Sequence, residues 1–123
     1  MQSPNNSVVI LNEDTDLVNL FRDVLEQQRF ETHTFTDPSL ALEKIKAEPD
    51  RVSLVLTDYP TPRDTEIKIA KEAKNANQKV KVILTSAFDI SRADIANEGY
   101  DKFLQIPVKL STLVSTVREI LDS

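Results

Sequence analysis

Acidic side chains follow two of the apolar segments in this chain. Glu13 comes shortly after an apolar run over residues 8–11, and Asp58 directly follows a second run over residues 52–57. Two carboxylates brought close together repel each other unless one is protonated or a cation joins them. Oxygen ligands without Cys or His suit a hard ion, Mg²⁺ before others. Glu13 and Asp58 are therefore candidate metal ligands, with solvated polar loop ends as the alternative interpretation.

The residue counts exclude several other classes of site. The 123-residue chain has no Cys, one His (His33) and one Gly (Gly99). It therefore forms no disulfide framework, zinc cluster or cysteine nucleophile. A single Gly cannot build the glycine-rich loops of Walker or dinucleotide-binding sites. A Ser-His-Asp triad would need His33, which falls on a weak strand away from the two carboxylates and is expected at the surface.

Length and charge limit the domain organisation and the partners. The chain has one domain's length on the usual scale of about 100–200 residues, and we expect it over residues 7–123, after a flexible tail over residues 1–6. The formal net charge of −5 argues against direct binding to nucleic acid or membranes. No apolar run approaches the ~20 residues of a membrane span. The tail lacks the basic and apolar regions of a signal peptide, so we expect a cytoplasmic protein.

Apolar runs of strand length alternate with segments of helical period. The continuous run Val8–Leu11 is typical of a strand buried on both faces. Strands are expected over residues 8–11, 30–35, 52–57, 80–85 and 102–105, and helices over residues 17–28, 38–48, 67–74, 91–98 and 110–121. This order gives five βα units.

Polar residues precede the apolar stripe of several predicted helices. The expected N-caps are Asp14 or Thr15 for the first helix, Asp37 before Pro38 for the second, and Ser111 for the last. Gly99 stands where a left-handed residue would close the fourth helix. The apolar faces assigned to the first, second and last helices include Leu20, Leu40 and Leu110.

The alternation predicts an α/β fold, a single doubly wound five-stranded parallel sheet with helices on both faces. At this length the flavodoxin-like strand order 2-1-3-4-5 is expected, and sites in such sheets lie beyond the carboxyl ends of the strands. Strands one and three are neighbours in that order, so Glu13 and Asp58 should converge there. The hydroxyls of Thr85 and Ser86 end the fourth strand at the same edge.

Four segments in this order resemble the receiver domain of two-component response regulators, the CheY-like family. The resemblance covers nearly the whole chain, from about Ser7 to Leu121. The first is an acidic cluster before the first helix, Asn12–Leu17, and the second is a strand that ends in Asp and is followed by Pro, Leu54–Pro62. The third is a strand end that carries hydroxyl groups, Val82–Phe88, and the fourth is the region of the fifth strand, Gly99–Pro107.

The resemblance implies a phosphorelay function. Asp58 would accept a phosphoryl group from a sensor histidine kinase or a phosphotransfer protein. Mg²⁺ would be held by Glu13, Asp58 and the backbone carbonyl of Pro60, with Asn12 as a weak ligand. The family is a signalling module, so we expect a switch of a protein-interaction surface rather than an enzyme.

The resemblance also implies roles near the last two strands. Ser86 would donate a hydrogen bond to the phosphoryl oxygen, and Thr85 is the alternative hydroxyl, one residue earlier. Ser86 is preferred because Ser86-Ala87-Phe88 fits the family's pattern. Phe103 would be the aromatic side chain that changes rotamer with it, with a plain core residue as the other interpretation.

Three positions depart from the family's pattern. Asn12 stands where the family has Asp, Ile106 where it has Lys, and Glu66 where it has Gly. The lost Lys would pair directly with the phosphoryl group. Three other cations could substitute but are more commonly solvated surface charges: Arg63, Lys102 and Lys109. We therefore expect weak Mg²⁺ binding and a labile or slowly formed phosphoryl-Asp.

Two functions follow from these residues. One is a phosphorylation-driven switch, favoured by the retention of Asp58, Glu13 and Ser86. The other is a phosphorylation-independent pseudo-receiver, a protein-docking module favoured by Asn12 and Ile106. An EF-hand is discarded because a strand precedes the acidic cluster and no Gly follows it at the required place.

Overall fold

The computed structural model describes residues 7–58, 69–86 and 99–122. Its strands form one sheet in the order β2-β1-β3-β4-β5, and every neighbouring pair is parallel. The strands are β1 (Ser7–Leu11), β2 (Glu31–Phe35), β3 (Val52–Asp58), β4 (Lys81–Ser86) and β5 (Lys102–Gln105). The α/β class, the parallel sheet and the strand order predicted from the sequence are confirmed.

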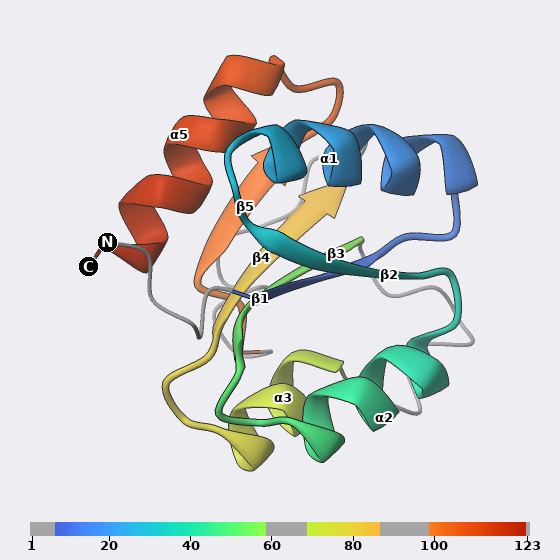
Figure 1. Cartoon of the computed structure of the whole chain (residues 1–123), viewed down its shortest axis with the longest axis vertical. Coiled ribbons are helices and arrows are strands. Elements are labelled where there is room, and N and C mark those ends of the chain that lie inside the picture. Colours follow the sequence, from blue (N-terminus) through green and yellow to red (C-terminus); the bar gives the residue numbers. More distant parts are fainter. Residues whose placement is uncertain (1–6, 59–68, 87–98, 123) are drawn as a thin grey trace.

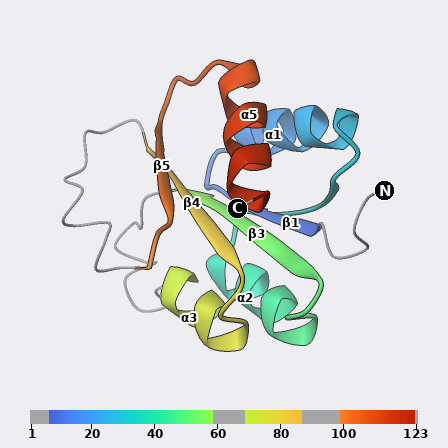
Figure 2. The same cartoon turned by 90° about the vertical axis from the view of Figure 1, so that its left-hand side faces the viewer.

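Helices cover both faces of this sheet (Figures 1 and 2). On one face lie α1 (Thr15–Gln27) and α5 (Leu110–Leu121); on the other lie α2 (Pro38–Ala47) and α3 (Ile69–Ala76). The helix predicted over residues 91–98 and the tail over residues 1–6 lie outside the described residues. In the described ranges no helix combines the length and apolarity needed to cross a bilayer.

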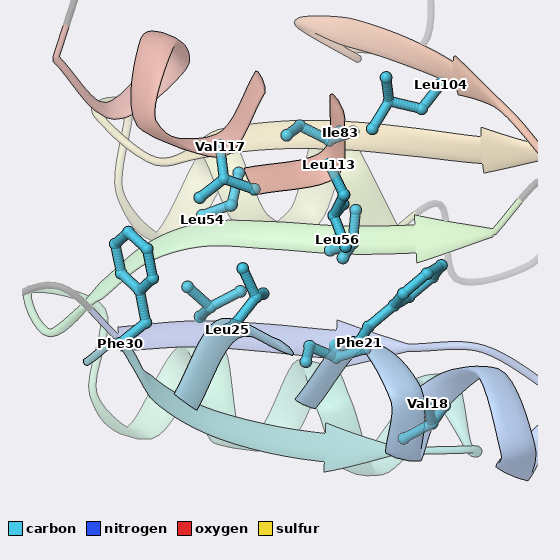
Figure 3. Packing of buried hydrophobic residues seen from close by; sticks show 12 residues of the cluster. Val18, Phe21, Leu25, Phe30, Leu54, Leu56, Ile83, Leu104, Leu113 and Val117 are labelled. Atoms are coloured by element: carbon cyan, nitrogen blue, oxygen red, sulfur yellow. The ribbon is translucent and has the colours of Figure 1, made fainter. Parts of the chain in front are cut away.

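The interior strand β1 shows why the sheet needs both helix layers. All five of its residues are buried, and successive side chains of a strand point to opposite faces. Val8 and Ile10 therefore join the core under α1 and α5, while Val9 and Leu11 join the core under α2 and α3. Figure 3 shows the first of these cores, where side chains from α1 and α5 meet those of β3, β4 and β5.

Local capping matches the sequence at two helix starts and not at a third. The Asp14 carboxylate accepts hydrogen bonds from the backbone N–H groups of Asp16 (2.9 Å) and Leu17 (3.3 Å), so Asp14 is the N-cap of α1. Asp37 caps α2 in the same way. The prediction of Ser111 as a cap is wrong: Lys109 precedes α5, and its side chain makes no capping bond. Gly99 has the predicted positive φ, 89°.

Three leucines assigned to buried faces are exposed, which corrects the sequence prediction. Leu20 is 42% exposed, Leu40 53% and Leu110 38%. In α1 the buried residues are Val18, Phe21 and Leu25, spaced three and four residues apart along one helix face. Leu20 is one residue before Phe21 and is therefore turned about a quarter of a circle away from that face.

The burial of Leu54 predicts a large stability loss on truncation. Leu54 lies on β3, the strand between β1 and β4. It is 0% exposed and belongs to the core under α1 and α5. Leu54→Ala should lower the free energy of unfolding by about 2–5 kcal/mol, because it removes apolar contacts and leaves a cavity. Leu40→Ala, at an exposed position, should change it by less than about 0.5 kcal/mol. Urea denaturation of both variants measures the difference; equal losses would contradict the assigned core.

Candidate functional site

The carboxyl ends of four strands meet at one edge of the sheet. The chain leaves β1 at Asn12 and Glu13, β3 ends at Asp58, β4 at Ser86 and β5 just before Ile106. The strand register brings these ends level, because Asp58 lies opposite Thr85 and Ser86 lies opposite Gln105. Parallel pairing therefore collects the polar residues singled out in the sequence at one edge.

Glu13 and Asp58 are in direct contact. The backbone N–H of Glu13 donates a hydrogen bond to Oδ2 of Asp58 at 3.3 Å, although the two residues are 45 positions apart in the chain. Glu13 is exposed and Asp58 is partly buried. The structure thus brings together the two carboxylate-bearing residues that the strand order predicted to converge.

The side chains on either side of Glu13, those of Asn12 and Asp14, both accept hydrogen bonds from backbone N–H groups. The Asn12 side chain is buried, and its Oδ1 accepts a hydrogen bond from the Asp14 N–H at 2.8 Å. The Asp14 carboxylate is used by the start of α1. Asp14 is therefore a helix cap. Among the described residues singled out at this edge, Glu13 and Asp58 are the two whose carboxylates are not used to cap a helix. Our sequence prediction missed the Asn12 turn, although Asn commonly bonds a backbone N–H two residues on.

The two hydroxyls at the end of β4 have different surroundings. Thr85 is 1% exposed, and its Oγ1 donates to the backbone carbonyl of Thr57 at 3.2 Å. That hydroxyl therefore links β4 to β3. Ser86 is also buried, and its carbonyl accepts the Ile106 N–H at 2.7 Å. The commitment of the Thr85 hydroxyl to the sheet is consistent with the preference for Ser86 as the functional hydroxyl.

Ile106 is the residue next to Ser86 at the end of β5. Its side chain is half-buried, and the following bond to Pro107 is cis. An apolar side chain thus stands beside the edge where the sequence resemblance would place a cation. Lys102 and Lys109 are exposed, and Phe103 is half-buried opposite Leu84.

Other residues of the sequence analysis lie elsewhere. Pro60, Arg63 and Glu66 are outside the described residues. His33 lies on the edge strand β2, where Nε2 is 3.3 Å from Oε2 of Glu31. It is half-buried rather than fully at the surface.

The donor set of the edge suits a hard cation. Glu13 and Asp58 supply carboxylate oxygens, and oxygen donors are the ligands that Mg²⁺ prefers. Within the described ranges no cluster of three or more His, Asp or Glu side chains is arranged to hold a metal ion. Mg²⁺ tolerates this, because it is commonly bound through one or two carboxylates and keeps several waters.

The chain resembles known proteins over most of its length. The family model described as response regulator receiver domain matches residues 8–118. The transcriptional regulatory protein CpxR of Klebsiella pneumoniae is 26% identical over 117 residues, which cover 94% of this chain and 49% of CpxR. The chain therefore spans about half the length of this curated relative.

Two solved structures share the fold. A CheY-like response regulator receiver domain protein from Methanospirillum hungatei superimposes with a TM-score of 0.84 at 22% identity, covering 95% of this chain and 94% of that one. The response regulator TrrA of Thermotoga maritima, in complex with Mg²⁺ and BeF, gives a TM-score of 0.81 at 19% identity, covering 94% and 98%.

The hydrogen bond between Thr85 and Thr57 can be tested without a ligand. Thr85→Val keeps the side-chain shape but removes the hydroxyl, so it should lower the free energy of unfolding by about 1 kcal/mol. The same change at Thr112, exposed on α5, should have an effect below about 0.5 kcal/mol. Urea denaturation compares the two, and an unchanged Thr85→Val protein would show that the hydroxyl does not stabilise the strand pair.

Proposed function

This chain belongs to the response regulator receiver domain family, and on that premise we propose that phosphorylation of Asp58 switches its affinity for a protein partner. The observation that carries the proposal is the contact of the Glu13 N–H with the Asp58 carboxylate at 3.3 Å. This contact places the partly buried carboxylate of Asp58 beside a second acidic residue, Glu13. Both lie at the edge of the sheet where α/β folds bind ligands.

The reaction is a phosphoryl transfer to a carboxylate. A bond forms between a carboxylate oxygen of Asp58 and phosphorus while the P–N bond of a phosphohistidine breaks, and the leaving imidazole takes a proton from solvent. Such transfers depend on positioning and on compensating the charge of the phosphoryl oxygens. Hydrogen bonds from the Glu13 N–H and the Ser86 hydroxyl are the contributions that we assign to this chain.

Mg²⁺ fits the oxygen donors at this edge. Glu13, Asp58 and the backbone carbonyl of Pro60 would hold it, with Asn12 as a weak ligand, and when bound it would neutralise charge on the phosphoryl oxygens. TrrA, a structural neighbour, was crystallised with Mg²⁺ and BeF. We expect weaker binding here, because Asn12 contributes no formal charge.

Ser86 and Phe103 are the proposed switch elements. Ser86 would donate to a phosphoryl oxygen, and Phe103, half-buried on β5, would change rotamer in response. Ile106 next to Ser86 offers no positive charge to the phosphoryl group. The phosphoryl-Asp should therefore form slowly or be labile.

The partners are proposed from the family. A sensor histidine kinase or a phosphotransfer protein would supply the phosphoryl group, and a further protein would recognise the switched surface. We place this exchange in the cytoplasm.

A phosphorylation-independent docking module is the second candidate. Ile106 and Asn12 favour it, since together they remove a cation and an acid that the family's pattern has at this site. In that case the fold would present the same surface without covalent modification.

Phosphorylation of Asp58 is tested with acetyl phosphate and Mg²⁺, read by intact mass. The wild type should gain the mass of one phosphoryl group, and Asp58→Asn should not. Asp23→Asn, at an exposed ion-paired position on α1, is the matched control and should be modified like the wild type. No mass gain in the wild type at any donor concentration would support the docking module instead.

Restoring a cation beside Ser86 should strengthen the reaction. Ile106→Lys should raise the rate of modification or the lifetime of the product by about tenfold or more, because a hydrogen bond to a charged group is worth roughly 1.5–3 kcal/mol. Gln105→Lys adds the same charge one residue away, at an exposed position, and should change both by less than about twofold. Equal effects of the two variants would indicate a general charge effect, and no effect of Ile106→Lys would show that the cation is not limiting.

A further inference from the structure

We propose that Asn12 is a positioning residue that holds the Glu13 N–H on the Asp58 carboxylate. This inference rests on the proposed function, in which Asp58 is the phosphoryl acceptor. Asn12 would act through the backbone of the loop after β1, not by touching the phosphoryl group.

The Asn12 side chain is placed to organise this loop. It is only 6% exposed, and its Oδ1 accepts the Asp14 N–H at 2.8 Å. A bond from a side-chain oxygen to the N–H two residues on closes a tight turn around the residue between them. That residue is Glu13, so the bond determines where the Glu13 N–H points.

Both ends of the turn are anchored to the fold. The Asn12 N–H donates to the carbonyl of Phe35 at 3.2 Å, which ties the turn to the end of β2. At the other end Asp14 caps α1. With both ends held, the Glu13 N–H reaches Oδ2 of Asp58 at 3.3 Å. Hydrogen bonds from N–H groups to an ionised carboxylate are stronger than those between neutral groups.

Asn12 is neutral, so it holds the turn without adding a third negative charge beside Glu13 and Asp58. An Asp at the same place could close the same turn and would strengthen the proposed Mg²⁺ site, but without the metal it would repel the other two carboxylates. The positioning role therefore needs an acceptor oxygen at this position, not a charge.

The first measurement is the amide signal of Glu13 in ¹H–¹⁵N NMR spectra and its hydrogen-exchange rate. Asn12→Ala should move the signal and speed its exchange, as should Asp58→Ala, which removes the acceptor. Asn12→Asp keeps an acceptor for the Asp14 N–H and should retain the wild-type exchange protection, even though the new charge next to Glu13 moves its signal. Asn12→Ser, a milder change with a weaker acceptor, should give an intermediate result and serves if Asn12→Ala does not fold.

The matched control is Asn77→Ala. Asn77 makes the same kind of turn, its Oδ1 accepting the Lys79 N–H at 3.0 Å, but it lies before β4, at the opposite edge of the sheet. Asn77→Ala should leave the Glu13 amide unchanged. At saturating Mg²⁺, where the loss of a weak metal ligand no longer limits the reaction, it should also leave the rate of Asp58 modification by acetyl phosphate within about twofold of the wild type. Under the same conditions Asn12→Ala should lower that rate about tenfold.

The outcomes separate this inference from the proposed function. An unchanged Glu13 amide in Asn12→Ala, or an equal rate loss in Asn77→Ala and Asn12→Ala, would overturn the positioning role. A changed amide with an unchanged rate would overturn it too, because the held N–H would then have no consequence. If the wild type is never modified but the amide follows the predicted pattern, the proposed function fails while the geometric role of Asn12 stands.

Discussion

The pairing of β1 with β3 is the constraint on which the site depends. β1 is buried on both faces, and it has β2 and β3 as its neighbours. A strand of this kind can lie only in the middle of a sheet covered by helices on both sides. Once it pairs in parallel with β3, the segment after Leu11 and the residue after Thr57 must emerge side by side. The contact between Glu13 and Asp58 follows from this arrangement, because no local preference could join residues 45 positions apart.

The edge of the sheet at the carboxyl ends of the strands carries acidic, neutral and apolar side chains and, among the described residues singled out there, no cation beside Ser86. Two acidic residues share it, while the third, Asp14, is committed to the start of α1. The neutral Asn12 and the apolar Ile106 add no charge of either sign. The backbone hydrogen bond from the Glu13 N–H therefore has a larger share of the electrostatics at Asp58 than it would have in a site with a fixed lysine. The strength of such a hydrogen bond depends closely on geometry, so the rigidity of the loop after β1 would matter for the proposed function.

Several features could be predicted because they depend on neighbours in the sequence. Asp14 and Asp37 could be identified as caps, since a cap bonds N–H groups two or three residues away. The same local rule predicted Ser111 wrongly, because α5 begins at Leu110, before it. Leu20 and Leu40 were assigned to buried faces because apolar character alone does not tell which side of a helix meets the sheet. That choice depends on the packing of the whole layer.

The sequence by itself determined the alternation of strands and helices, the strand order and the pair of carboxylates at the strand ends. Hydrophobic period gives the alternation and the strand ends, and the order 2-1-3-4-5 follows from the topology that parallel α/β sheets of this length adopt; both can be read without coordinates. Only the tertiary structure decided that the Thr85 hydroxyl is used by β3 and that Asn12 closes a turn around Glu13. The reason is physical: a hydrogen bond forms with whichever polar atom lies within about 3 Å in the right direction, and that is known only when the strands have been packed.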